Sequence, residues 1–376
     1  MFAVVPSFQN ILLGNFENKP IPRDENDSPT FMHIVAGVFI YNEKENKFLI
    51  QKRSIHKKTY PGHFTDSASG HINASSELDL NFIKEGMCRE LSEEMGVQAN
   101  PSDLNLWTIF HDNEMNEIKF VFLGLVQDLV TKLDPMEVSV DGSGWYTLSE
   151  LSSLIETEKF VPPVVGLWKV LIENGEKIME FIKTLDEWQE YWRDFCDLEE
   201  YLDWKVTNKR KIPLYIGRFQ PFHLGHLKCL ELIRESHEEI IIGIGSAQYS
   251  RSKRNPLSFN ARREILKHIL EKEGLNFSRV FIIPIPDMHD EVNWMLNVKL
   301  IFENDIILFS NNDWVRGLAE KEDVQLGEKF LFDRSNLKAT RIRELIRTGK
   351  EWKQFTPKSC FNYMKEKGLI EKIKNS

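Results

Sequence analysis

The chain has 376 residues, which is enough for two or three domains of about 150 residues each. Its hydrophobic fraction of 41% and charged fraction of 28% lie near the averages for soluble globular proteins, so composition argues against a disordered, collagen-like or membrane chain. The formal net charge of -9 argues against a dedicated nucleic-acid-binding protein, although a local basic pocket for one nucleotide remains open.

The four cysteines do not show the C-x-x-C spacing of a zinc or redox site. They are Cys88, Cys196, Cys229 and Cys360. We therefore expect a reduced, cytoplasmic setting. No stretch has the pattern of a signal peptide or of a membrane span, so we expect no membrane partner and no nucleic acid, and we leave a homo-oligomer open.

The first part of the chain predicts a mixed α+β domain over residues 1–184. Two β-rich runs are separated by polar residues 42–46, which is typical of a hairpin. Gly96 is expected to end the first long helix. We expect strands over residues 33–41, 47–53, 107–110 and 118–126 and helices over 81–95 and 164–182.

Residues 185–211 are rich in aromatic and charged side chains, and we place a connector there. We favour a surface helix that covers its own domain over a partner-binding element. The following region, 212–376, alternates short Ile-rich runs with helical segments, the pattern of a parallel sheet buried on both faces. The strands are expected at residues 212–216, 240–244, 280–283 and 306–309.

A carboxylate cluster marks the helix over residues 81–95. Glu90, Glu93 and Glu94 are related by spacings of three and four, which predicts that they lie on one face. Like charges so placed repel one another, and a hard divalent cation such as Mg²⁺ would turn that repulsion into binding. The alternative is an ordinary solvated acidic face.

Residues 89–97 read R-E-L-S-E-E-M-G-V and resemble the core of the Nudix box, R-E-U-x-E-E-x-G-U, where U is aliphatic. The resemblance covers about residues 33–182 and implies an α/β/α sandwich. It also implies metal-activated hydrolysis of a nucleoside diphosphate derivative, with Mg²⁺, or Mn²⁺ as the alternative, held by Glu90, Glu93 and Glu94. The general base is left open between Glu93, Glu94 and Glu117.

Residues 51–53, 60–62 and 70–71 look like the isopentenyl diphosphate isomerase-like branch of the Nudix proteins. True isomerases of that branch use a cysteine just before the Gly-His element, where this chain has Ala68, so we expect no isomerase activity. The box departs from the family at Asn81, where the spacing asks for Glu, and in a loop insertion before the helix. These departures favour a non-catalytic sensor or assembly domain, whereas the intact carboxylates favour hydrolysis.

Residues 217–226 read G-R-F-Q-P-F-H-L-G-H and join a predicted strand to a helix. A helix N-terminus offers free N–H groups and the positive end of its dipole to an anion. His223 and His226 lie three residues apart on the first turn, so both can face one phosphate, and Gly225 permits a close approach. The alternatives are core histidines or a metal pair, but the strand, turn and helix context favours phosphate.

This segment resembles the H-x-G-H signature of the nucleotidyltransferase superfamily, and the surrounding residues narrow the resemblance to archaeal-type nicotinamide mononucleotide adenylyltransferase. Further matches lie at residues 243–248, 254–257, 286–287 and 340–343 and at Trp294. The resemblance implies a Rossmann-like parallel sheet and transfer of AMP from ATP to nicotinamide mononucleotide, giving NAD and pyrophosphate. Lys338 stands where the family usually has Ser.

The resemblance also assigns roles. His223, His226 and Arg343 would be catalytic, by holding the triphosphate and spreading the developing charge, and Mg²⁺ would arrive with ATP. Trp294 would stack on the nicotinamide ring, although a core aromatic is its alternative. The implied nucleotide-binding residues are Gly217, Arg218, Phe219, Gly225, Ser246, Arg254, Asp287, Trp294 and Thr340.

The sequence thus predicts a bifunctional enzyme of NAD metabolism, with a Nudix hydrolase domain, a connector and an adenylyltransferase domain. The expected partners are ATP, nicotinamide mononucleotide and NAD for the second domain. By analogy with related fusions, ADP-ribose is the expected substrate of the first, with AMP and ribose 5-phosphate as products. The alternative is an adenylyltransferase whose Nudix domain is a ligand sensor or an assembly module and has no catalytic activity.

Overall fold

The protein is described from a computed structural model that divides the chain into two compact units. The N-terminal unit comprises Met1–Gln189 and Met288–Asn297, and the C-terminal unit comprises Glu190–Asp287 and Val298–Ser376. The division after Gln189 falls inside the predicted connector, whereas the grouping of Met288–Asn297 with the first unit was not expected from the sequence. The structure describes residues 2–5, 8–12, 19–21, 32–75, 78–112, 115–175, 178–185, 196–289, 291–303, 305–330 and 337–376.

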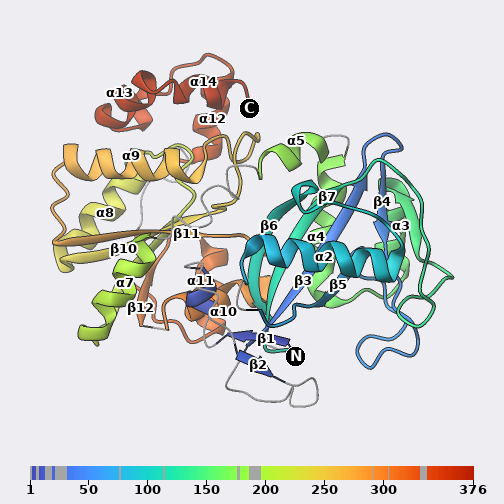
Figure 1. Ribbon diagram of the computed structural model, residues 1–376. Helices are drawn as coiled ribbons and strands as arrows, with labels where there is room; N and C mark the ends of the chain where they lie inside the picture. Colours follow the sequence, from blue (N-terminus) through green and yellow to red (C-terminus); the bar gives the residue numbers. More distant parts are fainter. Residues whose placement is uncertain are drawn as a thin grey trace. The chain divides into compact units, whose positions relative to one another are not determined.

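The described part of the N-terminal unit contains one mixed sheet of eight strands (Figure 1). Its centre is β3, which pairs in parallel with β7 and antiparallel with β1, β4 and β5. The predicted hairpin is confirmed, because Asn42 pairs with Lys47 at the end of β3 and the start of β4. The strands are β1 (Phe2–Val5), β2 (Lys19–Ile21), β3 (Met32–Asn42), β4 (Lys47–Ile50), β5 (Ala68–His71), β6 (Leu104–Asp112), β7 (Glu117–Leu125) and β8 (Gly144–Thr147).

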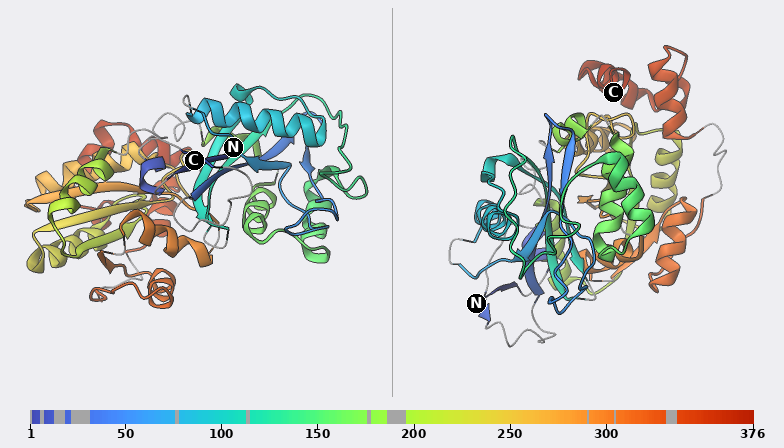
Figure 2. Two further views of the ribbon diagram at one scale, coloured as in Figure 1. Left: turned by 60° about the horizontal axis from the view of Figure 1, so that its bottom comes forward. Right: turned by 90° about the vertical axis from the view of Figure 1, so that its right-hand side faces the viewer.

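Helices lie on both faces of this sheet. Both views of Figure 2 show α2 (Leu80–Met95) on one face and α4 (Pro162–Asn174) on the other, which agrees with the predicted sandwich. The predicted helix over residues 164–182 is two helices, because α4 ends at Gly175 (φ 51°) and α5 (Ile178–Lys183) follows. The other described helices of this unit are α1 (Phe8–Leu12) and α3 (Leu148–Thr157).

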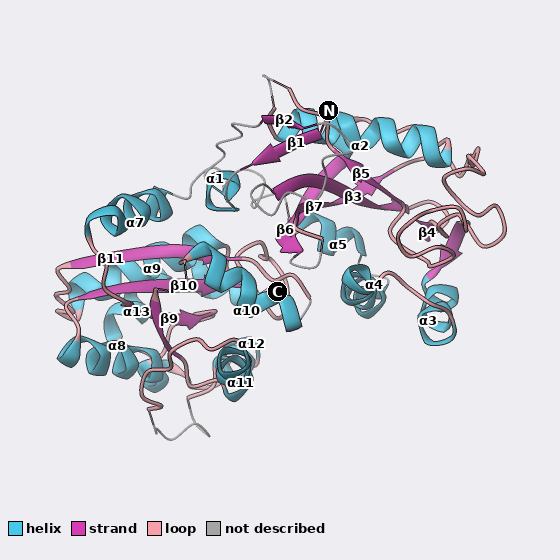
Figure 3. Cartoon of the chain, turned by 90° about the horizontal axis from the view of Figure 1, so that it is seen from below, coloured by secondary structure: helices cyan, strands magenta, loops and turns pink. Residues whose placement is uncertain are grey.

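The four described strands of the C-terminal unit form a parallel sheet in the order β11, β10, β9, β12. The strands are β9 (Ile212–Gly217), β10 (Glu239–Gly245), β11 (Arg279–Ile285) and β12 (Ile306–Phe309), so all four predicted strands are present. Figure 3 shows the strands flanked by helices. The order reverses beside β9, and open parallel sheets bind ligands at the carboxyl ends of the strands at such a switch.

Some helices of the C-terminal region pack on this sheet, and others pack on those helices. In α7 (Cys196–Thr207), Tyr201 and Trp204 are buried, and the Tyr201 ring centroid lies 5.6 Å from that of Phe281 in β11. Within the predicted connector, α7 thus packs on the sheet of the C-terminal unit. The others are α8 (Leu224–Ser236), α9 (Phe259–Lys272), α10 (Glu291–Ile301), α11 (Asp313–Lys321), α12 (Ala339–Arg347), α13 (Lys358–Glu366) and α14 (Leu369–Lys374). None of the described helices has the length and apolar character that crossing a membrane requires.

Candidate active sites

The three box glutamates of α2 do not share one environment. Glu93 is exposed, and its carboxylate accepts a hydrogen bond from Arg89 at 3.3 Å. Arg89 also pairs with Glu90 at 2.9 Å. The Glu90 carboxylate lies over Gly70 of β5, where an added Cβ would be 2.8 Å from a Glu90 oxygen. A side chain at position 70 would therefore displace the Glu90 carboxylate from its place over β5.

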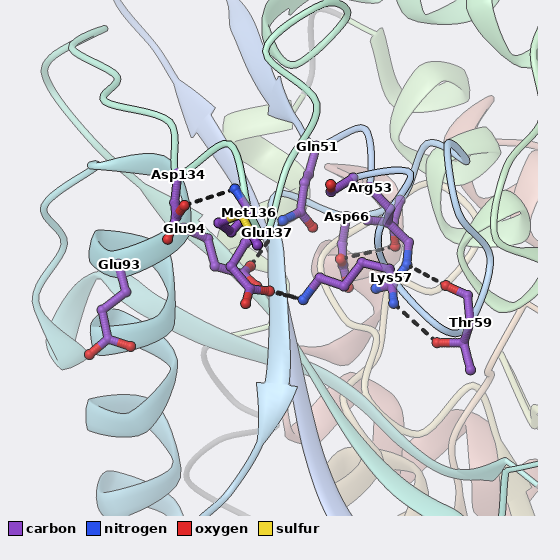
Figure 4. A network of polar contacts seen from close by, with 12 residues as sticks. Gln51, Arg53, Lys57, Thr59, Asp66, Glu93, Glu94, Asp134, Met136 and Glu137 are labelled. Carbon is purple, nitrogen blue, oxygen red and sulfur yellow. Dashed lines mark hydrogen bonds and ion pairs between the residues drawn. The ribbon is translucent and has the colours of Figure 1, made fainter.

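The Glu94 side chain is buried, whereas Figure 4 shows the Glu93 carboxylate pointing away from Glu94. The Gln51 side-chain amide donates to Glu94 at 3.0 Å, and the Lys57 ammonium lies 3.8 Å from the same carboxylate. Burial raises the pKa of Glu94 to about 7, although Lys57 and Gln51 act in the opposite direction. Lys57 also pairs with Glu137.

Gly96, at the end of the box motif, explains why Glu137 lies close to Lys57. Gly96 has a φ of 69°, and a Cβ there would lie 2.5 Å from the backbone nitrogen of Lys132. The backbone N–H groups of Lys132 and Asp134 donate to carbonyls at the end of α2, those of Met95 and Glu94. The loop that contains Glu137 is thus fixed to the C-terminus of the box helix, as helix ends require.

Two further acidic groups lie beneath α2. Asp66 is buried against Gly37 of β3, and burial raises its pKa to about 6, with Lys119 opposing the shift. Glu117 lies 3.5 Å from His71 on the neighbouring part of the sheet. Burial alone would raise the pKa of Glu117, but the hydrogen bond and charge of His71, together with Lys119, bring it below its usual range.

Glu90 and Glu94 offer the carboxylate oxygens that a hard divalent cation prefers, whereas Lys57 places a competing positive charge beside Glu94. Within the described residues, however, no group of three or more His, Cys, Asp or Glu side chains is arranged to hold a metal ion. The sequence predicted that Glu90, Glu93 and Glu94 converge, whereas here each carboxylate faces a cationic or amide partner from the chain.

The histidine turn of the C-terminal unit lies between β9 and α8. His223 is the N-terminal cap of α8, and its ring stacks on that of His226 at a centroid distance of 3.6 Å. The backbone N–H of His223 donates to Nδ1 of His226 at 3.2 Å. Burial lowers the pKa of His223 to about 4 and that of His226 well below its ordinary value. Both imidazoles are therefore neutral near pH 7.

Glycines give this turn its shape. A Cβ at Gly225 would lie 3.1 Å from the His223 ring, and one at Gly217 would lie 2.8 Å from the ring of Phe219. The Phe219 centroid is in turn 4.9 Å from that of His226. A side chain at either position would therefore push against one of these rings, most severely at Gly217.

Arginines from three segments lie close enough to repel one another. Burial, together with the charges of Arg218, Arg347 and Arg254, lowers the pKa of Arg343 to about 10. Burial and the charge of Arg254 also lower the pKa of Arg218. Among the described residues, Nη1 of Arg218, Nε of Arg343 and Nδ1 of His223 are buried without a hydrogen-bond partner. A bound anion would both relieve this repulsion and satisfy these nitrogens.

Hydrogen bonds connect Arg343 to the histidine turn. Arg343 of α12 donates to the Gln220 carbonyl at 2.7 Å and to the Thr340 hydroxyl at 3.3 Å. The Gln220 side chain continues the network to Asn255 at 3.1 Å. Arg254 and Thr340 are exposed, as residues that meet a ligand can be. Three separate segments therefore meet at the end of β9.

A second predicted group lies at the end of β10. The Ser246 hydroxyl donates to the Asp287 carboxylate at 2.6 Å. Gln248 holds the backbone of Asp287 with two hydrogen bonds, of 2.7 and 3.0 Å. Trp294 is 7% exposed in α10, within the segment Met288–Asn297 that groups with the N-terminal unit.

Sequence reasoning missed several residues of these sites. Lys57 and Glu137 lie on separate loops that only tertiary structure brings together, so no local pattern marks them. Arg262 did carry a signal, because it interrupts the buried apolar stripe of α9 formed by Phe259, Ile265 and Ile269. A buried charge on such a stripe indicates a specific set of partners.

The strand, turn and helix with paired histidines and converging arginines define a nucleotidyltransferase class of site. Residues 214–345 match the Cytidylyltransferase-like family and residues 32–165 match the NUDIX domain family. The protein named nicotinamide-nucleotide adenylyltransferase from Pyrococcus horikoshii is 35% identical over 162 residues, which are 43% of this chain and 87% of that protein. Its namesake from Thermococcus sibiricus is 37% identical over 161 residues, which are 43% of this chain and 87% of that protein.

The chain therefore belongs, through its C-terminal unit, to the nicotinamide-nucleotide adenylyltransferase family, and it carries a NUDIX domain in its N-terminal unit. Among solved structures, a bifunctional NMN adenylyltransferase/ADP ribose pyrophosphatase from Francisella tularensis is 23% identical, with a TM-score of 0.37, over 44% of this chain and 50% of that one. Its complex with AMP and a manganese ion is 24% identical, with a TM-score of 0.34, over the same shares.

Proposed function

We propose that the C-terminal unit transfers AMP from ATP to nicotinamide mononucleotide, giving NAD and pyrophosphate. The observation that carries the proposal is the set of buried nitrogens without partners on His223, Arg218 and Arg343, at the N-terminus of α8 and among mutually repelling arginines. A polyphosphate supplies both the negative charge and the acceptor oxygens that such a site lacks. Family membership indicates which nucleotides are joined.

The reaction needs no covalent enzyme intermediate. A phosphate oxygen of nicotinamide mononucleotide attacks the α-phosphorus of ATP, and the bond from that phosphorus to the bridging oxygen breaks as pyrophosphate leaves with the electron pair. His223 and His226 are neutral, so each acts as a hydrogen-bond donor to phosphate oxygen. Arg343 and Arg218 add positive charge where negative charge accumulates. Mg²⁺, bound with ATP, would neutralise further phosphate charge.

The remaining predicted residues have positions that suit this reaction. Thr340 lies in the first turn of α12, where N–H groups face outward, and Arg254 contributes to the field around Arg343. Asp287, held by Ser246 and Gln248, would orient the amide or ribose of nicotinamide mononucleotide. Stacking of Trp294 on the nicotinamide ring belongs to the proposal as well.

His226 offers the direct test of this function in the full-length chain. We expect His226→Ala to lower the rate of NAD formation more than about tenfold, because it removes a donor at the reacting phosphate. His237, the C-terminal cap of the same helix, provides a matched control, and His237→Ala should retain the rate. NAD formed from ATP and nicotinamide mononucleotide is measured by chromatography. An unchanged rate in His226→Ala would remove His226 from the mechanism.

For the N-terminal unit we propose hydrolysis of ADP-ribose to AMP and ribose 5-phosphate. The NUDIX domain and the acidic surroundings of α2 support a divalent-cation-dependent diphosphate hydrolase, and Mg²⁺ is the cation that we propose. Glu90, Glu93 and Glu94 would hold it. The cation would supply charge neutralisation of the diphosphate. The base that takes the proton from water stays open between Glu93, Glu94 and Glu117.

The competing proposal, a NUDIX unit that binds a nucleotide without cleaving it, rests on Asn81, which donates to Glu85 at 2.7 Å on the outer surface of α2. The buried position of Glu94 favours catalysis instead. Release of AMP from ADP-ribose and other nucleoside diphosphate derivatives, across a Mg²⁺ series, decides between them. Absence of AMP at every Mg²⁺ level would favour the sensor. Dimethylallyl diphosphate formed from isopentenyl diphosphate would contradict the expectation, based on Ala68, that the domain is not an isomerase. A cytoplasmic location completes the proposal.

A further inference from the structure

Arg262 is a fully buried arginine that the proposed reaction leaves unexplained. It lies in α9, with a relative exposure of 0%, on the same face as Phe259 and Ile265. A guanidinium withdrawn from water is stable only where several acceptors surround it. The position of those acceptors therefore indicates what Arg262 holds in place.

Five hydrogen bonds join its guanidinium to backbone carbonyl oxygens. Nε donates to the carbonyl of Ser258 in the first turn of its own helix at 3.2 Å. The rest of the guanidinium reaches the carboxyl ends of two neighbouring strands. Nη1 donates to the carbonyls of Arg218 and Gly245, at 3.1 and 2.7 Å. Nη2 donates to those of Ser246 and Ala247, at 3.1 and 3.5 Å. One planar side chain thus links the turn after β9 to the turn after β10.

Both turns contain a residue in an unfavourable backbone conformation. Phe219 has a φ of 52° and Ser246 a φ of 50°, in the left-handed region that residues with a Cβ seldom adopt. Each residue follows a carbonyl that Arg262 holds, that of Arg218 or that of Gly245. In a trans peptide the C=O and the next N–H point in opposite directions, so fixing these carbonyls also fixes the N–H groups of Phe219 and Ser246.

The two turns belong to the two sides of the nucleotide site. The first contains Arg218, and the ring of Phe219 packs against His226. The second contains Ser246, whose hydroxyl donates to Asp287. A shift of one turn against the other would misplace the phosphate-binding and nucleoside-binding groups together.

We propose that Arg262 is a positioning residue that fixes the turns after β9 and β10 to each other, so that each nucleotide binds to a pair of turns already in register. Arg262 does not contact substrate. This inference rests on the proposed adenylyl transfer for the identity of the two ligands, ATP and nicotinamide mononucleotide. If the proposal is correct, loss of the guanidinium weakens the binding of both nucleotides, because each turn depends on Arg262 for its position relative to the other.

The test uses Arg262→Lys and Arg262→Gln in the full-length chain, with Arg263→Gln as the matched control. Arg263 is the next residue, and it pairs instead with Asp197 at 2.6 Å. Calorimetric Kd values for Mg²⁺ with ATP, and separately for nicotinamide mononucleotide, are measured beside the KM and kcat of NAD formation. We expect both Kd values to rise about tenfold in Arg262→Lys and further in Arg262→Gln, while Arg263→Gln changes stability without changing either Kd.

A folded Arg262→Lys variant that binds both nucleotides with wild-type Kd values would overturn the proposal, as would an effect on only one nucleotide. If neither variant folds, hydrogen exchange in the unmodified protein decides. Saturation with either nucleotide alone should then protect the amides of residues 217–219 and 245–247 together. Protection of a single turn by each ligand would overturn the linkage. If the wild-type protein binds ATP but forms no NAD, the proposed reaction fails, whereas the effect of Arg262 on ATP binding can still be measured.

Discussion

In the N-terminal unit, carboxylates of α2 lie beside cations of the chain, whereas in the C-terminal unit the arginines near the histidine turn lie beside one another. Glu90 and Glu93 are paired with Arg89, and Glu94 faces Lys57. Arg343, by contrast, has its pKa lowered to about 10 by burial and by neighbouring arginines. The first site thus contains its own counter-ions, whereas among the described residues of the second site the buried arginines outweigh the one carboxylate, Asp287, that acts on Arg218.

This difference predicts different binding thermodynamics. A metal ion that enters the N-terminal site must compete with cations already present, so its apparent affinity is reduced by the free energy of displacing them. A polyphosphate that enters the C-terminal site removes repulsion among buried cations and satisfies nitrogens without partners. Binding of that anion should therefore stabilise the C-terminal unit strongly.

The largest expected effect comes from Glu94, because it is the buried carboxylate of the acidic site. We expect Glu94→Gln to lower Mg²⁺-dependent hydrolysis about a hundredfold or more, and Glu93→Gln, at an exposed position, to have a smaller effect. Hydrolysis is measured as AMP released from ADP-ribose. The two sites lie in separate units and share no partner, so NAD formation should be unchanged.

Glu85 provides the control for this experiment, because it lies on the exposed side of the same helix and accepts a hydrogen bond from Asn81. Glu85→Gln should leave both activities intact. Equal loss of hydrolysis and NAD formation in Glu94→Gln would contradict the comparison between two independent sites.

The features that the sequence predicted are those that depend on neighbours along the chain. The box helix was predicted within one residue at its start, because its end at Gly96 and its apolar spacing are local signals. The four strands of the parallel sheet were predicted for the same reason, as continuous apolar runs. The spacing of His223 and His226 also predicted that the two imidazoles lie close together, and their rings stack at the start of α8.

The features that could not be predicted depend on residues far apart in sequence. Arg343 donates to Gln220 across 123 residues, and only the family resemblance suggested that they meet. The spacing of Glu90, Glu93 and Glu94 predicts convergence on a bare helix, but pairing with Arg89 and the inward turn of Glu94 separate the carboxylates. The break of the predicted helix over residues 164–182 is a different case, because Gly175 is a local helix-ending signal that the prediction overlooked.

A smaller effect, expected at Lys57, would sharpen the comparison. If the Lys57 ammonium competes with the metal for Glu94, then Lys57→Met should lower the Kd for Mn²⁺, used as a spectroscopic probe, by about fivefold. Paramagnetic resonance of free Mn²⁺ measures that Kd without substrate. Lys58→Met, at the exposed neighbouring position, is the matched control and should bind Mn²⁺ as the wild type does. Weaker binding in Lys57→Met would show that the lysine supports the metal instead of competing with it.

The smallest expected effect is on stability and concerns the buried, neutral histidines of the cationic site. Burial lowers the pKa of His223 from 6.5 to about 4, so between these values the unfolded chain binds a proton that the folded protein does not. Stability therefore falls as the pH falls from 6.5 towards 4, and His223→Asn should remove part of that loss. Thermal unfolding of both proteins at pH 5 and pH 8 measures the effect. The melting temperature of the variant, relative to the wild type, should rise by about 2 to 4 °C at the lower pH.

Above pH 7.5 the difference between the two proteins should be constant, because the imidazole is neutral in both states, and this range serves as the internal control. An equal pH dependence in the two proteins would show that His223 is protonated in the folded site at the lower pH. The protonation state of the histidines would then no longer distinguish the C-terminal site from the N-terminal site.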